Sequence, residues 1–314
     1  MNVTRGFAYR TDVPFYHTDR PSVIPHVSDT TFALGAPIIA YWVLSLFFHV
    51  LDVSTWKWLE KYRLHDSAEV KSKNLATRSQ VIWAVLLQQV IQTGLGYIWV
   101  TEQKHITTEN RTDALHRIGE AVMDVTWTVL GKRLGTQFLN ARGADTVYFV
   151  YWWAIPIAQF FLAMFVIDTW QYFLHRLMHV NKWLYKQFHS THHRLYVPYA
   201  FGALYNHPVE GFLLDSVGAV LGECLSMMSV RQTILFFAFS TLKTVDDHCG
   251  YQFPWDPLQL LSGNNADYHD IHHQVIGIKS NFAQPFFVHW DNILGTRMTR
   301  ADIEKRRSKV KKAL

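Results

Sequence analysis

Three uninterrupted apolar stretches constrain this chain more than any other feature of its sequence. Residues 32–51, 81–100 and 147–167 contain no Lys, Arg, Asp or Glu. A helix of about 20 residues is roughly 30 Å long, which matches the hydrocarbon core of a bilayer. Aromatic residues such as Trp42 and Trp152 edge the stretches, as in the interfacial belts of membrane proteins. We therefore predict an all-α integral membrane protein rather than a soluble domain with three buried helices.

The polar segments between and after these stretches complete the expected topology. Residues 113–139 carry apolar positions at helical spacing, which predicts an amphipathic helix, either on the membrane surface or packed on other protein. Residues 209–245 are apolar with a few interrupting charges, and they are long enough for two short crossings. We predict a helical hairpin there. The polar segments before and after it, 168–207 and 248–314, should then meet on one face of the membrane as a cap.

Charge and cysteine content bound the partners and the compartment. The net charge is +5, and residues 274–314 carry nine Lys and Arg against three acids. No nucleic-acid-binding module accompanies this basic tail, so we predict no nucleic-acid partner and a cytosolic tail facing an anionic leaflet. The final Lys-Lys-Ala-Leu of residues 311–314 resembles the dilysine signal for retrieval to the endoplasmic reticulum. The two cysteines cannot form a disulfide scaffold, which favours a reducing, intracellular setting.

Histidines gather in the second half of the chain, where ten of the seventeen lie between residues 175 and 273. One cluster has i, i+4 spacing and two triplets have i, i+3, i+4 spacing. Residues three and four apart share a helical face, and neutral imidazoles bind transition metals. One histidine is more often a hydrogen-bonded core residue, but three spaced clusters flanking a hairpin are poorly explained in that way. The clustered histidines that we predict as metal ligands are His175, His179, His189, His192, His193, His269, His272 and His273, with the single His207 and His248 as weaker candidates.

The number of nitrogen donors predicts two metal ions. A structural zinc needs four ligands and a catalytic zinc about three, whereas eight to ten imidazoles serve two ions. Iron is favoured because an all-imidazole cage below lipid-accessible spans suits redox chemistry on an apolar substrate. A zinc hydrolase is an alternative that the donors leave open, although it explains neither the spans nor the hairpin. A histidine-rich metal transporter would place ligands inside its spans, where the first three stretches hold only His49.

The three clusters match the histidine boxes of the integral-membrane fatty acid hydroxylase and sterol desaturase superfamily. Short flanking segments, such as Ala203-Leu-Tyr-Asn-His-Pro-Val-Glu210 and Asp247-His-Cys-Gly-Tyr251, resemble those of its sphingoid-base hydroxylase branch. The resemblance covers nearly the whole chain. We divide the chain into a polar N-terminal segment (1–31), membrane spans with their amphipathic connection (32–146), a catalytic domain (147–290) and a basic tail (291–314).

This resemblance implies a function. It predicts O2-dependent hydroxylation of sphinganine or dihydroceramide at carbon 4 by two iron ions, with electrons from cytochrome b5 and its reductase. It also predicts an endoplasmic reticulum membrane protein with cytosolic histidines and a cytosolic C-terminus. The alternatives in the same superfamily are a sterol C4-methyl oxidase and a sterol desaturase. A non-catalytic scaffold is a further class, although it would not need all three clusters.

The expected chemistry sets requirements on the rest of the site. An unactivated methylene has no acidic proton, so a metal and O2 must supply the oxidising power. The protein must hold one carbon near the metals in an apolar groove whose mouth is polar enough for an amino-diol head group. Five acids near the clusters are candidates for accepting a ring N–H, or else they are ordinary capping or solvated acids: Asp168, Glu210, Asp247, Asp267 and Asp270.

Overall fold

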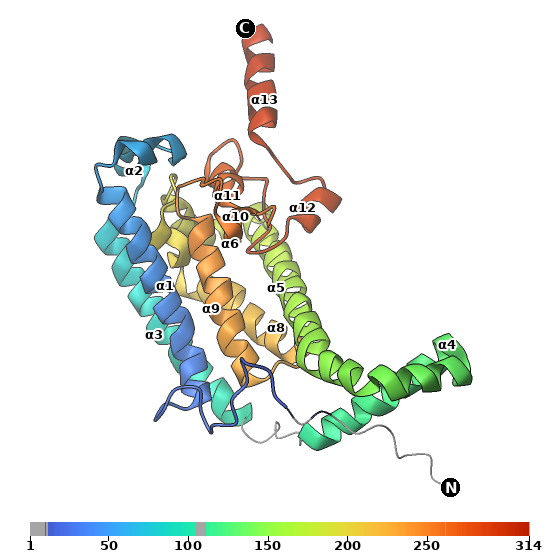
Figure 1. The fold of residues 1–314 in the computed structure, drawn as a ribbon. Coiled ribbons are helices and arrows are strands. Elements are labelled where there is room, and N and C mark those ends of the chain that lie inside the picture. Colours follow the sequence, from blue (N-terminus) through green and yellow to red (C-terminus); the bar gives the residue numbers. More distant parts are fainter. Residues whose placement is uncertain (1–9, 11, 104–110, 261, 314) are drawn as a thin grey trace.

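The computed structural model describes residues 10, 12–103, 111–260 and 262–313, and nearly all of them belong to helices or short connections (Figure 1). The described residues include a single isolated β-bridge, between Arg63 and Tyr251. The all-α prediction is therefore confirmed. The elements are α1 (Asp29–Val53), η1 (Lys57–Tyr62), α2 (Ser67–Lys73), α3 (Arg78–Gln103), α4 (Arg111–Phe149), η2 (Val150–Ala154), α5 (Ile155–Val180), α6 (Lys182–Gln187), η3 (His189–Arg194), η4 (Ala200–Leu204), α7 (Pro208–Gly211), η5 (Phe212–Val217), α8 (Gly218–Ser226), α9 (Val230–Asp247), α10 (Pro257–Leu260), α11 (Ala266–His273), α12 (His289–Ile293) and α13 (Arg300–Ala313).

Three helical runs are long and apolar enough to cross a membrane, as the sequence predicts. They are α1, the Arg78–Trp99 part of α3, and the continuous run Arg111–Val180 that contains α4, η2 and α5. Large apolar side chains such as Phe47 of α1 and Val90 of α3 are exposed on these helices. A water-soluble protein would bury such residues, whereas a bilayer accommodates them.

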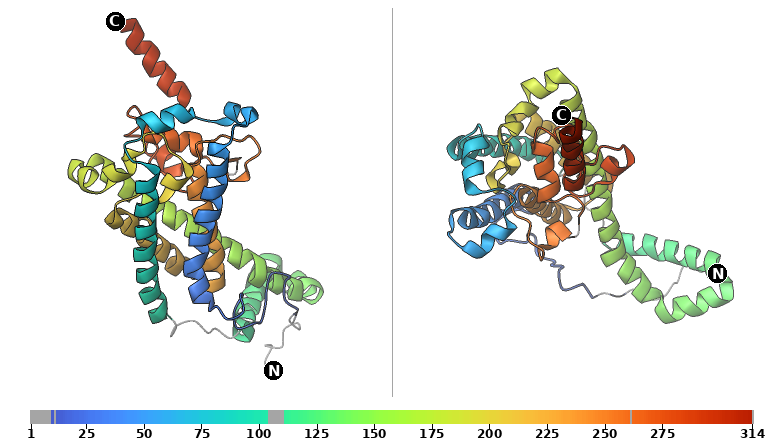
Figure 2. Two further views of the ribbon diagram at one scale, coloured as in Figure 1. Left: turned by 90° about the vertical axis from the view of Figure 1, so that its left-hand side faces the viewer. Right: turned by 90° about the horizontal axis from the view of Figure 1, so that it is seen from above.

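The predicted amphipathic helix over residues 113–139 is present, but it is bent into a hairpin. The two halves of α4 meet at Gly131, whose φ of +73° is in the left-handed region that glycine adopts readily. The halves pack closely, because a Cβ on Gly135 would lie 2.8 Å from Cδ1 of Trp127. Seen from above, the hairpin projects sideways from the bundle (Figure 2). It lies at the end opposite the histidine-rich cap (Figure 1).

The hairpin predicted over residues 209–245 is confirmed. α7, η5 and α8 lead away from the cap, and the turn before α9 has Met227 in the left-handed region with φ 54°. Ser229 starts α9 with a capping box, because its side chain accepts from the backbone of Gln232 while the Gln232 side chain accepts from the Ser229 N–H. α8 packs on α5, and α9 packs along α1. The chain thus returns to the cap.

The cap is built from the segments that follow α5 and α9, together with the connection after α1 (Figure 1). An aromatic cluster joins it to the bundle, and Tyr41 of α1, which is fully buried, donates its hydroxyl hydrogen bond to the Phe201 carbonyl oxygen at 2.8 Å. Phe48 of α1 stacks on Tyr251 of the cap, with ring centroids 6.0 Å apart. The histidine-bearing segments are therefore held directly against the spans.

Candidate metal centre

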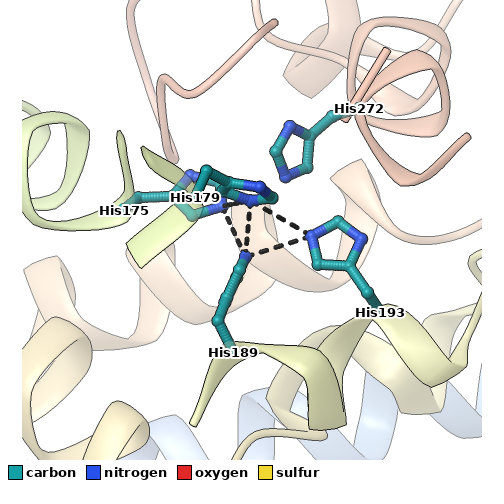
Figure 3. A group of neighbouring side chains, drawn as sticks. All are labelled: His175, His179, His189, His193 and His272. Atoms are coloured by element: carbon teal, nitrogen blue, oxygen red, sulfur yellow. Dashed lines mark hydrogen bonds between the residues drawn. The ribbon is translucent and has the colours of Figure 1, made fainter. Parts of the chain in front are cut away.

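Nine of the ten predicted ligands converge in the cap as two groups, and within each group the ring nitrogens lie within 4.8 Å of one another. The five-histidine group draws its members from α5, η3 and α11, and its rings point toward one centre (Figure 3). The four-histidine group draws on η3, α11 and the residue after α9. The first group comprises His175, His179, His189, His193 and His272, and the second comprises His192, His248, His269 and His273.

Each triplet is shared between the two groups. The outer members of the first triplet join the five-histidine group, and its middle member, His192, joins the four-histidine group. In the second triplet the outer members join the four-histidine group, and the middle member, His272, joins the five-histidine group. In α11 helical geometry accounts for this division. His269 and His273 are about 40° apart around the axis, and His272 lies about 60° to the other side of His269. One short helix therefore offers donors to two separate groups.

In the five-histidine group, hydrogen bonds at Nδ1 hold three of the rings, those of His175, His189 and His272, so that Nε2 faces inward. His175 Nδ1 lies 2.8 Å from the Phe282 carbonyl oxygen, and His272 Nδ1 lies 2.7 Å from that of Ser280. A carbonyl oxygen only accepts, so Nδ1 carries the proton and Nε2 carries a lone pair. His175 Nε2 is 3.0 Å from Nε2 of His189, whose own Nδ1 contacts a carboxylate. Two lone pairs at this distance repel unless a cation lies between them, which is how metal ligands are arranged.

The four-histidine group repeats this pattern. His192 and His248 face each other through Nε2 atoms 3.5 Å apart, and the Nε2 atoms of His269 and His273 are 3.0 Å apart. Three of these rings direct Nδ1 at a backbone carbonyl oxygen, at 3.2 Å for His192, 2.8 Å for His248 and 2.7 Å for His273. Their carbonyl partners are Tyr205, Thr244 and Leu195, respectively.

Burial keeps the rings neutral, which is the form that binds metal. Eight of the nine are buried, and His193 is partly buried. Removal from water lowers the pKa of His192 to about 4 and the pKa of His248 and of His272 to about 3. His272 Nε2 is buried and has no hydrogen-bond partner among the described residues. The donor set and this unpartnered nitrogen both fit bound metal.

Among the described residues, one carboxylate contacts a ligand ring directly. Glu210 of α7 lies with its Oε1 2.5 Å from His189 Nδ1, and both side chains are buried. Burial raises the pKa of Glu210. This contact orients the ring and makes the Nε2 lone pair a stronger metal ligand, as carboxylates behind metal-bound histidines generally do. The sequence placed Glu210 among five acids without distinguishing it.

The other four acids have different partners. They accept from backbone N–H groups or form ion pairs that fasten the loops around the centre. Asp168 accepts from the N–H groups of Phe286 and Phe287, Asp247 pairs with Lys243, Asp267 pairs with Arg300, and Asp270 pairs with Arg300 and His65.

His207 is the one predicted ligand that lies in neither group. Its Nδ1 accepts a hydrogen bond from the N–H of Val209 at 3.2 Å, which makes it the N-cap of α7. Its ring packs edge-on against Phe188, with centroids 5.1 Å apart. The ring is therefore committed to the start of a helix. His248, the other single histidine, lies in the four-histidine group.

Sequence reasoning missed the groups that fix the tautomers, because most of them are backbone carbonyls. The carbonyl oxygens of Leu195, Tyr205, Thr244, Ser280 and Phe282 have no signal in side-chain chemistry. Only the folded chain brings them behind the rings.

Comparison with known proteins shows which family the chain resembles. Residues 160–296, which include all ten predicted ligands, match the family model described as fatty acid hydroxylase. The chain is 45% identical to the sphingolipid C4-hydroxylase of Saccharomyces cerevisiae, over 94% of this chain and 80% of that protein. It is 44% identical to sphinganine C4-monooxygenase 1 of Arabidopsis thaliana, over 89% of this chain and 92% of that protein.

Two further relatives bear on the substrate. A protein of Oryza sativa subsp. indica named very-long-chain aldehyde decarbonylase is 42% identical, over 87% of this chain and 90% of that protein. Methylsterol monooxygenase 2-1 of Arabidopsis thaliana is more distant, at 34% identity over 46% of this chain and 57% of that protein. Comparison with solved structures found no match.

Proposed function

Since the chain belongs to the fatty acid hydroxylase family, we propose that it is a sphinganine C4-monooxygenase. It would insert one oxygen atom from O2 at carbon 4 of sphinganine or dihydroceramide. The observation that carries this proposal is the pair of buried histidine groups in a chain that matches sphingolipid C4-hydroxylases over most of its length. The match to a sterol enzyme covers less than half of the chain, which makes a sterol substrate the weaker alternative.

The metals of this proposal are two iron ions, one held by the five-histidine group and one by the four-histidine group. Bound iron supplies the activation of O2 that oxidation of an unactivated methylene requires. The chain's own residues hold the Nε2 atoms of most of these rings inward through hydrogen bonds at Nδ1, and they keep the rings neutral and largely out of water. The catalytic domain is proposed to cover residues 147–290.

The reaction requires an external reductant. Hydroxylation of one carbon by O2 consumes two electrons and two protons and releases one water. We propose cytochrome b5 and its reductase as the source, because the sequence has no flavin or haem motif of its own. The proposed location is the endoplasmic reticulum membrane with the cap in the cytosol. The excess of Lys and Arg in residues 274–314 supports it. Leu314, the last residue of the dilysine pattern, lies outside the described residues.

A microsomal assay tests the reaction. With NADH and O2, sphinganine or dihydroceramide should gain one hydroxyl at carbon 4, and ¹⁸O should enter it from labelled O2 and not from labelled water. An antibody that blocks cytochrome b5 should slow the reaction. Product whose hydroxyl oxygen comes from water would rule out the proposed chemistry.

Product analysis also separates the alternatives. A sterol product without any 4-hydroxy sphingoid base would move the chain to the sterol branch. Loss of one carbon from a long-chain aldehyde would favour the decarbonylase activity after which the rice relative is named. Either result would leave the metal centre standing and reject the sphingoid substrate.

A further inference from the structure

A largely apolar cavity of about 530 Å³ lies between α1, α3, α8 and α9. Its lining reaches Thr244 at one end, whose carbonyl oxygen holds His248 Nδ1. It extends to Ala33, near the start of α1, and to Trp99, near the end of α3. The cavity therefore begins beside the four-histidine group and follows the spans away from the cap. A cavity of this size accommodates a small lipid.

One carboxylate in its wall has no charged partner among the described residues. Asp215, in η5, lines the cavity and accepts hydrogen bonds from Gln88 Nε2 at 3.2 Å and Gln92 Nε2 at 3.4 Å. Both bonds use Oδ2, and in the described part of the chain no Lys, Arg or His forms an ion pair with this residue. Two amide donors alone would be satisfied equally well by a neutral asparagine. An ionised carboxylate among spans is costly unless a cation accompanies it, and a cationic ligand in the cavity would supply one.

Asp215 lies nearer than the other acid of the cavity wall to Glu210 and to its ligand contact. Glu210, which touches the ligand His189, lies five residues earlier on the same helical run, about 7 Å along the axis. In sphinganine the ammonium nitrogen is three bonds from carbon 4, roughly 4 Å away. Glu223, the other acid of the cavity wall, is thirteen residues from Glu210, about 20 Å along the axis, which is too far to bind the head group of a chain whose carbon 4 lies at the metals.

We infer that this cavity binds a free sphingoid base, with its ammonium group on Asp215 and its hydrocarbon chain among the apolar residues that line the cavity. The inference rests on the proposed function and refines its substrate. N-acylation replaces the ammonium by a neutral amide, which removes the ion pair and adds a second chain. The site is therefore selective for sphinganine over dihydroceramide.

Replacement of Asp215 by asparagine tests the ion pair, because asparagine keeps the shape and an oxygen for Gln88 and Gln92. The purified protein, reconstituted with its reductant in micelles, is assayed with sphinganine and with N-acetylsphinganine. Asp215→Asn should raise KM for sphinganine by about ten- to a hundredfold and leave KM for N-acetylsphinganine unchanged. Iron content and gel filtration of the variant verify that it is folded.

Glu223→Gln is the matched variant, because it neutralises the other carboxylate of the same cavity. It should leave the ratio of the two KM values unchanged. Equal effects of Asp215→Asn on both substrates, or no effect, would overturn the ammonium site, and so would a change of the ratio in Glu223→Gln alone. A wild-type protein that hydroxylates only dihydroceramide would reject this inference and keep the proposed function, whereas a wild type that makes no 4-hydroxy product would reject both.

Discussion

The ten histidines differ in what their second ring nitrogen touches. Rings whose Nδ1 faces a carbonyl oxygen, such as His175 and His273, direct a lone pair into the centre. His207 uses Nδ1 to accept from a backbone N–H and lies outside both groups. The assignment of a histidine as a candidate ligand therefore depends on its hydrogen-bond partner as much as on its spacing.

Loss of one ligand should reveal the two-ion arrangement. His192→Ala removes a nitrogen from the four-histidine group and His272→Ala removes one from the five-histidine group. Each variant should abolish hydroxylation and lower bound iron, by about one ion of two, measured by metal analysis of purified protein. His17→Ala is the control, because His17 contacts Asp19 and Trp152 away from the centre. His105, a second control by sequence, lies outside the described residues. Full iron and activity in either cluster variant would disprove the assignment.

Glu210 offers a graded test of ring orientation. Glu210→Ala removes the acceptor at His189 Nδ1, so iron should be lost to a chelator about 10- to 100-fold more readily. Glu210→Gln keeps an acceptor oxygen and should retain most of the iron. Glu120→Ala, at an exposed position of α4, is the control. If Glu210→Ala retained iron as well as the wild type, the carboxylate would have no orienting role.

At the scale of elements, the loop after α11 carries two of the carbonyls that orient ligands, Ser280 and Phe282. Asn281 between them donates from Nδ2 to the carbonyl oxygens of Tyr268 and Met298. Asp291 of α12 accepts from the N–H groups of Phe282 and Ala283. Side-chain bonds from distant segments therefore hold the loop that holds the rings.

The start of this loop tolerates no side chain. A Cβ on Gly277 would lie 1.9 Å from the Ile271 carbonyl oxygen, so the backbone must shift in Gly277→Ala. We expect a destabilisation of about 1–3 kcal/mol and a lower iron content, followed as thermal unfolding in detergent and by metal analysis. Gly35→Ala in α1, where nothing lies within 4 Å of the added Cβ, should melt at or above the wild-type temperature. Equal melting of both variants would contradict this packing.

On the scale of the whole molecule, the two ends of the bundle differ. The metal centre, the connection after α1 and the C-terminal helix lie at one end, and the α4 hairpin lies at the other (Figure 1). The apolar outer faces of the helices between them suit lipid. The protein therefore presents its metal centre and its basic tail to the same compartment.

That compartment is predicted to be the cytosol. In sealed microsomes a tag at the C-terminus should be digested by added protease without detergent, because the tail carries the excess of Lys and Arg. A tag in the connection between α1 and α3 should behave in the same way, since that connection is part of the cap. Protection of both tags until detergent is added would invert the topology, and protection of one would contradict the fold.

The sequence by itself determined the membrane spans, the hairpin and the histidine clusters. Length and hydropathy are properties of one segment, and spacing along a helix decides which side chains share its face. These features can therefore be recognised in the sequence without knowledge of the fold. Both the span in residues 32–51 and the triplet ending at His273 were predicted in this way.

Only the tertiary structure decided how the clusters combine. In the folded chain His192 lies beside His248, and His272 lies beside His175. Glu210 contacts the Nδ1 of His189, and His207 is the N-cap of a helix outside both groups. The tertiary structure also placed Asp215 in the wall of a cavity whose other walls come from α1, α3 and α9. These relations join residues far apart in the chain, often through backbone carbonyls that every residue possesses. No local pattern encodes them, because they follow from how the helices pack.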